Sequence, residues 1–206
     1  NEKLIFKIVP EGNTRTIMVQ TGEADVNVNF DTVAMAECQA DPNVQVIQHE
    51  SSRIDLLILN TASEAFADKR VRQAVAFAVN RDDCLSVGAE GYGAVCYSSL
   101  SPSTEGYVDN PAGYKYDVEK AKALLAEAGF PGGEGFPVVE YLYNTADNHK
   151  AIGEYLQSAL AGVGITMNLE NQEWNTFLNT RKEGDYSIAR NGWLADYNDP
   201  ICFLDM

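Results

Sequence analysis

The sequence contains few of the residues on which metal sites and nucleophilic enzymes depend. Only two histidines occur among the 206 residues, and the four cysteines form neither a CxxC pair nor a zinc-type spacing. A nucleophile elbow, an HExxH motif and a Cys–His arrangement are also absent from the sequence. We therefore expect no metal site, no cofactor and no enzymatic activity of the hydrolase class.

Basic residues are also scarce. Fifteen Lys and Arg residues stand against thirty Asp and Glu residues, which gives a formal net charge of −15 at pH 7. Such a charge repels nucleic-acid phosphates and anionic lipids, so neither class of partner is expected. The simplest interpretation of the acidity is a well-solvated surface.

Long hydrophobic runs are missing as well. No apolar run approaches the roughly 20 residues of a membrane-spanning helix, and no signal peptide is present. The chain begins at Asn1, which we interpret as the start of an excised or processed piece whose targeting segment lies outside the sequence. The content of 45% hydrophobic and 22% charged residues is ordinary for a soluble globular protein.

Two of the cysteines allow two interpretations. Cys84 and Cys96 are close enough in sequence to form a helix-to-loop disulfide in an oxidising compartment. They can equally be small buried hydrophobic residues. The sequence does not decide between the two.

The first part of the chain predicts alternating strands and helices. β-prone runs at 4–9 and 44–49 flank two expected helices, one capped by Asn13 or Thr14 and ending at Gln20, the other following Asp31 from 32 to 40. The near-continuous apolar run 54–60 predicts a strand that is buried on both faces.

The rest of the chain predicts a single sheet packed by helices. Asp68 and Asp117 precede amphipathic helices as N-caps, and a long loop without periodicity runs from 88 to 116. Further helices are expected at 149–162 and from 174 to a stop at Gly184. Strands are expected at 138–143, 165–169 and 186–190, which completes a β-α-β pattern.

The segment that follows the last expected strand has the composition of a ligand site. Arg190, Trp193 and Asp196 lie at the end of this strand, and Arg181 extends the apolar face of the preceding helix. A peptide in water carries an ammonium group and a carboxylate, and a receptor that buries it must neutralise both. Asp196 suits the ammonium group, the arginines and His149 suit a carboxylate, and Trp193 offers a flat apolar wall.

Each of these residues also has a purely structural alternative. His149 can be a helix cap or a surface residue, and Trp193 can belong to the core. Arg181 and Arg190 can be solvated, and Asp196 can cap the next turn.

Three motifs give the chain a family resemblance. YNTADNH, NQEWNTFLNTR and RNGWLADYNDP occur in this order along the chain, and with them most of the chain closely resembles the oligopeptide-binding proteins of ABC importers. The segments GEADV at 22–26 and VRQAVAFAVNR at 71–81 are also similar to the family pattern. The resemblance implies an α/β fold of the periplasmic-binding-protein type, with mixed sheets packed by helices. It further implies that residues 1–60 are part of the first lobe, including a crossover strand, and that residues 61–206 form the second, peptide-binding lobe.

The resemblance also implies roles for individual residues. Asp196 matches an aspartate that pairs with the amino terminus of the peptide, and Trp193 matches a tryptophan that lines a side-chain pocket. Arg190, Arg181 and His149 match residues around the deeper pocket and the carboxyl end of the peptide. Leu194 departs from the pattern, because a relative has a disulfide-bonded cysteine at this position, so no such bridge is expected here.

The resemblance implies a protein that binds its ligand and does not change it chemically. We expect a monomer that captures oligopeptides outside the cytoplasm, in the periplasm or anchored by lipid at the outer face of the membrane, and delivers them to the membrane subunits of an ABC permease. A binding protein of the same fold for a dipeptide, a nickel chelate or a sugar is the alternative.

Overall fold

The computed structural model describes residues 2–28, 30–109 and 113–205. Internal contacts divide the chain into two compact units, Asn1–His49 and Glu50–Met206, which we call the N-terminal unit and the C-terminal unit. No helix among the described residues is both long enough and apolar enough to span a bilayer.

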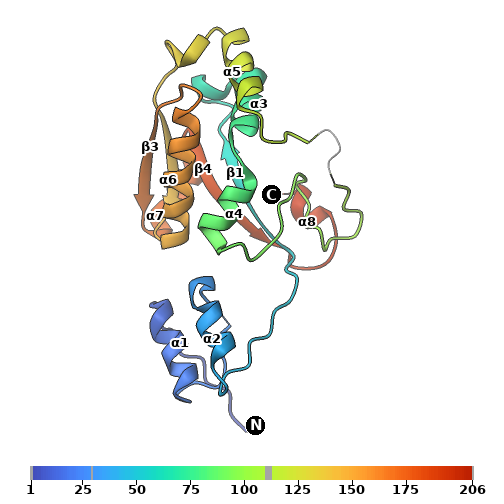
Figure 1. Cartoon of the computed structure of the whole chain (residues 1–206), viewed down its shortest axis with the longest axis vertical. Helices are drawn as coiled ribbons and strands as arrows, with labels where there is room; N and C mark the ends of the chain where they lie inside the picture. The colour runs from blue at the N-terminus through green and yellow to red at the C-terminus, as the bar shows by residue number, and fades with distance from the viewer. Residues whose placement is uncertain (1, 29, 110–112, 206) are drawn as a thin grey trace. The chain divides into compact units, whose positions relative to one another are not determined.

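The N-terminal unit consists of helices α1 (Gly12–Gln20) and α2 (Met35–Ala40) and a short 3-10 helix, η1 (Thr32–Ala34) (Figure 1). The two helices confirm the expected elements, although α1 begins before the predicted caps and the side chain of Asp31 makes no capping hydrogen bond. Asp31 instead accepts a hydrogen bond of 3.3 Å from Nη2 of Arg15.

The prediction of strands at 4–9 and 44–49 is wrong. No strand occurs among the described residues of the N-terminal unit, and most large apolar side chains of the first run are exposed. A β-prone segment forms a strand only when a neighbouring strand pairs with its backbone, and residues 2–28 and 30–49 supply no such neighbour.

The C-terminal unit is built on one mixed sheet. Its strands are β1 (Arg53–Leu59), β2 (Val139–Asn144), β3 (Met167–Gln172) and β4 (Ile188–Leu194), in the spatial order β1-β4-β2-β3. β4 and β3 are parallel to β2, whereas β1 is antiparallel to β4. The predicted single sheet is confirmed.

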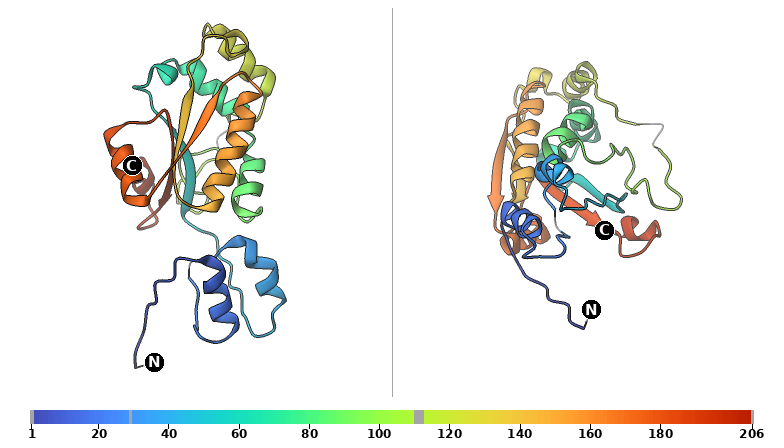
Figure 2. Two further views of the ribbon diagram at one scale, coloured as in Figure 1. Left: turned by 90° about the vertical axis from the view of Figure 1, so that its left-hand side faces the viewer. Right: turned by 60° about the horizontal axis from the view of Figure 1, so that its bottom comes forward.

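Helices cover both faces of this sheet, as the edge-on view shows (Figure 2, left). One face packs against the helices α3 (Lys69–Ala78), α4 (Arg81–Ala89), α5 (Val118–Glu127) and α6 (Asp147–Ala161), with the main hydrophobic core between them. The other face packs against α7 (Trp174–Glu183) and α8 (Ile201–Leu204). Two 3-10 turns, η2 (Glu64–Phe66) and η3 (Pro131–Gly133), complete the unit.

Local capping rules place two of these helices correctly. The carboxylate of Asp68 accepts a hydrogen bond from the backbone N–H of Arg70, and that of Asp117 accepts one from Lys120 N–H. Each bond satisfies a backbone donor that the first turn of a helix leaves free, which stabilises the helix by about 1 kcal/mol.

The edge strand β1 is less buried than the apolar run predicted. Ile54 is the one buried residue of β1. Leu56 on the same face, and Leu57 and Leu59 on the face of the main core, are only partly buried, so the predicted burial on both faces is incomplete.

The strand β1 lies at the edge of the sheet and pairs along its whole length with β4, so that it belongs to the C-terminal unit. The division between the two compact units falls between His49 and Glu50. The two lobes expected from the resemblance, residues 1–60 and 61–206, stay a prediction.

The long loop after α4 confirms the expected irregular segment. No helix or strand occurs between Glu90 and Asp117 in the described part of this loop, and residues 110–112 lie outside the described residues. Ser101 is fully buried, and its hydroxyl donates a hydrogen bond of 3.1 Å to the carbonyl oxygen of Ser51. The loop is thus fixed to the segment that leads into β1.

The disulfide considered for Cys84 and Cys96 does not form. Both are free thiols. Cys84 packs at the margin of the main core, where burial raises its pKa to about 11. Cys96 donates to backbone carbonyl oxygens of the loop at 3.2 and 3.3 Å.

Candidate functional site

Strand β4 organises the candidate site because successive side chains on a strand point to opposite faces of the sheet. Arg190 points to the face covered by α6, the same face as Ile188 in the main core. Asn191 and Trp193 point to the face covered by α7 and α8. The sheet therefore separates the predicted site residues into two groups.

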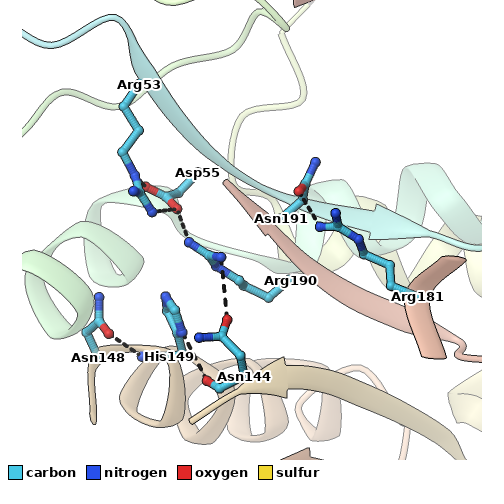
Figure 3. A network of polar contacts seen from close by, with 8 residues as sticks. All are labelled: Arg53, Asp55, Asn144, Asn148, His149, Arg181, Arg190 and Asn191. Atoms are coloured by element: carbon cyan, nitrogen blue, oxygen red, sulfur yellow. Dashed lines mark hydrogen bonds and ion pairs between the residues drawn. The ribbon is translucent and has the colours of Figure 1, made fainter. Parts of the chain in front are cut away.

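On the first face, Arg190 is the centre of a polar network (Figure 3). Its side chain is only 10% exposed, and Nη2 donates to Oδ1 of Asp55 at 2.9 Å. Nη1 makes a longer contact of 3.5 Å with Oδ1 of Asn144. Nε is buried and has no acceptor among the described residues. The guanidinium group is therefore held in place but keeps unused donor capacity.

Asp55 is shared between two arginines. Arg53 donates to it twice, from Nε to Oδ2 at 2.7 Å and from Nη2 to Oδ1 at 2.8 Å. Burial by itself raises the pKa of Asp55, but the hydrogen bonds and charges of Arg53 and Arg190 outweigh burial and lower this pKa. Burial also lowers the pKa of Arg190, against the attraction of Asp55. Two guanidinium cations thus share one carboxylate, and the group carries a net positive charge.

Gly192 makes room for this contact. It lies directly opposite Asp55 in the β1–β4 pairing. A β-carbon at this position would lie 2.5 Å from Oδ1 of Asp55, 2.6 Å from Nη2 of Arg190 and 2.9 Å from Nη2 of Arg53. The three charged groups therefore meet in the space that a side chain would occupy.

His149 lies in the first turn of α6, next to the same network. Its ring is buried, and Nδ1 donates to the carbonyl oxygen of Asn144 at 3.1 Å, which fixes the proton on this nitrogen because a carbonyl can only accept. Burial lowers the pKa of His149, and the nearby charge of Arg190 lowers it further. The neutral ring therefore presents Nε2 as an acceptor.

On the opposite face, Arg181 and Trp193 belong to a second group. Nη1 of Arg181 donates to Oδ1 of Asn191, and its guanidinium carbon lies 5.4 Å from the centre of the Phe177 ring. Arg181, Asn191 and Trp193 line a cavity of about 350 Å³ together with Ile58, Tyr186 and Asp205. The indole Nε1 of Trp193 is buried and has no acceptor among the described residues.

Asp196 lies in the exposed segment after β4. Its side chain has no hydrogen bond or ion pair among the described residues, so this carboxylate is available to a cation. It does not cap α8, since Asp199 accepts the hydrogen bond from Ile201 N–H there.

The structure brings the five predicted residues to one strand and its surroundings but not to one cluster. Arg190 and His149 lie together, and Arg181 and Trp193 lie together on the other face.

The sequence analysis missed Asp55, Asn144 and Asn191, which contact the predicted residues, and Arg53, which contacts Asp55. Asp55 could have been singled out from the sequence, because it is the one charged residue within the apolar run 54–60. Among the described residues, no group of three or more His, Cys, Asp or Glu side chains is arranged to hold a metal ion.

Comparison with known proteins identifies the family. The model of the bacterial extracellular solute-binding proteins, family 5 (middle region), matches residues 1–206. The chain belongs to this family of solute-binding proteins.

Solute-binding proteins of known sequence and structure resemble the chain over most of its length. Heme-binding protein A of Haemophilus influenzae is 31% identical over 205 residues, which cover 98% of this chain and 38% of the relative. The periplasmic oligopeptide-binding protein OppA of Salmonella typhimurium is 39% identical over 153 residues, 71% of this chain and 28% of the relative.

One solved structure is also closely similar. The periplasmic binding protein DppA of Helicobacter pylori, in complex with the peptide STSA, has a TM-score of 0.87 at 31% identity and covers 95% of this chain and 38% of that chain. This likeness confirms the predicted α/β fold of the periplasmic-binding-protein type. The chain thus spans only 38% of the length of that structure and of the Haemophilus relative.

Proposed function

We propose that this solute-binding protein captures oligopeptides outside the cytoplasm and delivers them to the membrane subunits of an ABC importer. Membership of the family over residues 1–206 supports this proposal. So do the names of two relatives, one an oligopeptide-binding protein and the other a structure in complex with a peptide.

The observation that carries the proposal is a pair of opposite charges, one within β4 and one just after it. Arg190 is buried with unused donor capacity, and Asp196, a short distance along the same segment, is exposed and has no ion pair with any residue that the structure describes. A zwitterionic peptide presents the complementary pair of charges, and burial of either end without a partner costs several kcal/mol.

Each site residue then has a role in binding. Asp196 pairs with the peptide ammonium group, and Arg190 with His149 receives the carboxyl end. The cavity lined by Arg181 and Trp193 receives a side chain, because an indole wall and a guanidinium group suit side chains of varied chemistry. The ligand is bound and released unchanged, so the protein is not an enzyme.

The proposed role also concerns the two units. The C-terminal unit, with all five residues, forms the peptide-binding lobe, and the N-terminal unit belongs to the other lobe. Closure of two lobes around a ligand is a common form of ligand capture. The protein acts as a monomer, either free in the periplasm or anchored by lipid at the outer face of the membrane.

The proposal predicts that the natural protein at its full length binds peptides. Isothermal titration with a mixed library of tri- to pentapeptides is the measurement, with the 206-residue chain titrated in parallel. We expect saturable binding by the natural protein and weaker or no binding by the chain alone, because a ligand held between lobes contacts both. Binding of a dipeptide, a nickel chelate or a sugar, with none of the oligopeptides, would contradict the proposal.

A further inference from the structure

We propose that Asp55 is a specificity-determining residue that limits how tightly the Arg190 site holds a carboxylate of the ligand. This inference rests on the proposed function, since it concerns the peptide carboxyl end at Arg190. Its basis is the contact between Asp55, Arg53 and Arg190 over Gly192 (Figure 3).

Asp55 occupies Nη2 of Arg190, the nitrogen that takes part in both edges by which a guanidinium group binds a carboxylate with two hydrogen bonds. Oδ1 of Asp55 accepts from Nη2 of Arg190 at 2.9 Å, whereas the remaining donors of the guanidinium group have one long contact at 3.5 Å or none. Asp55 is half exposed and Arg190 is almost buried, so Asp55 lies on the solvent side of the pair. A carboxylate that binds Nη2 of Arg190 therefore comes close to a carboxylate of the protein.

The position of Asp55 is fixed before a ligand arrives. Arg53 lies on the same face of β1, two residues away, and holds both oxygens of Asp55 at 2.7 and 2.8 Å. The missing side chain at Gly192 leaves the space in which these groups meet. The carboxylate of Asp55 is thus held beside Arg190 whether or not a ligand is bound.

The charges of this group set the consequence for a ligand. Arg53 and Arg190 attract an incoming carboxylate, but Asp55 repels it at close range and cancels one of the two positive charges. An uncharged amide at the same place is not repelled. The site therefore discriminates less between a free carboxylate and an amide than an unpaired buried arginine would.

The test compares two peptides that differ only at the carboxyl end. Trialanine and trialanine amide are titrated against the natural protein at its full length and against its Asp55→Asn variant at neutral pH. We expect Asp55→Asn to increase the preference for trialanine over its amide about tenfold, because the buried charge of Arg190 is no longer compensated. Asp185→Asn, at an exposed position after α7, is the control for net charge and should leave the preference unchanged.

A second measurement detects the loss of compensation without a peptide. In the variant, the pKa of His149 should fall further, since Arg190 lowers this pKa and Asp55 raises it. NMR titration of the histidine ring protons measures this pKa. If Asp55→Asn fails to fold, Asp55→Ser takes its place in both measurements.

The outcomes separate this inference from the proposed function. An unchanged preference in a variant that still binds both peptides contradicts the role of Asp55 and leaves the proposed function intact. Failure of the unaltered protein to bind either peptide overturns the proposed function, and this inference with it.

Discussion

Asp196→Ala is expected to weaken the binding of peptides with a free amino terminus about a hundredfold, which corresponds to about 2.7 kcal/mol. The ammonium group of a bound peptide then loses its counter-ion while it remains withdrawn from water. Asp196 makes no hydrogen bond within the described part of the chain, so its removal should leave the free energy of unfolding unchanged. The binding loss would therefore report the contact with the ligand alone.

Titration calorimetry with trialanine and N-acetyl-trialanine measures this effect. Acetylation removes the positive charge, so the acetylated peptide should bind weakly to the unaltered protein and no more weakly to Asp196→Ala. Asp185→Ala changes the net charge equally at another exposed position and serves as the control. Equal losses for both peptides would show that Asp196 does not bind the ammonium group.

Gly164→Ala is expected to destabilise the C-terminal unit by about 2–4 kcal/mol. Gly164 follows α6 with φ at +94°, in the left-handed region where alanine is strained. A β-carbon there would also lie 2.2 Å from the carbonyl oxygen of Gly132, a backbone atom of η3 that cannot move independently. The turn that leads from α6 into β3 would have to shift as a whole.

Gly184→Ala is the matched control for this substitution. Gly184 ends α7 with φ at +78°, but a β-carbon there meets nothing within 4 Å. We expect this variant to lose only about 1 kcal/mol, the cost of the left-handed conformation. Denaturant unfolding of both variants measures the difference in the free energy of unfolding. Equal decreases in the two variants would mean that the close approach of Gly164 to η3 does not contribute to the cost.

Elements defined by local rules could be predicted from the sequence. Asp68 and Asp117 act on backbone donors a few residues away, and an amphipathic pattern follows each, so capping and periodicity together locate α3 and α5. The strands β2, β3 and β4 lie within a few residues of their expected positions for a similar reason. Each follows a turn and contributes apolar side chains to the hydrophobic cores.

Elements that depend on distant partners could not be predicted in this way. Residues 4–9 have strong β propensity, yet the described part of the N-terminal unit contains no strand to pair with them. The strand β1 was located correctly, but the apolar pattern does not show that it lies at an edge of the sheet.

The candidate site shows the same limit. The resemblance indicated Arg190, but its counter-ion Asp55 is 135 positions away in the sequence, and only the pairing of β1 with β4 brings them together. Alternation along β4 would have predicted that Arg190 and Trp193 point to opposite faces. The resemblance, which assigns residues to one ligand, contains no such information about faces.

The most direct test of the account is the structure of the natural protein at its full length in complex with trialanine. We predict that the peptide lies at β4 and the segment that follows it, with its ammonium nitrogen within hydrogen-bonding distance of Asp196 and its carboxyl end toward Arg190 and His149. A peptide bound elsewhere, or bound at β4 without contact to Asp196, would contradict the claim that this segment captures the ligand by its charged ends.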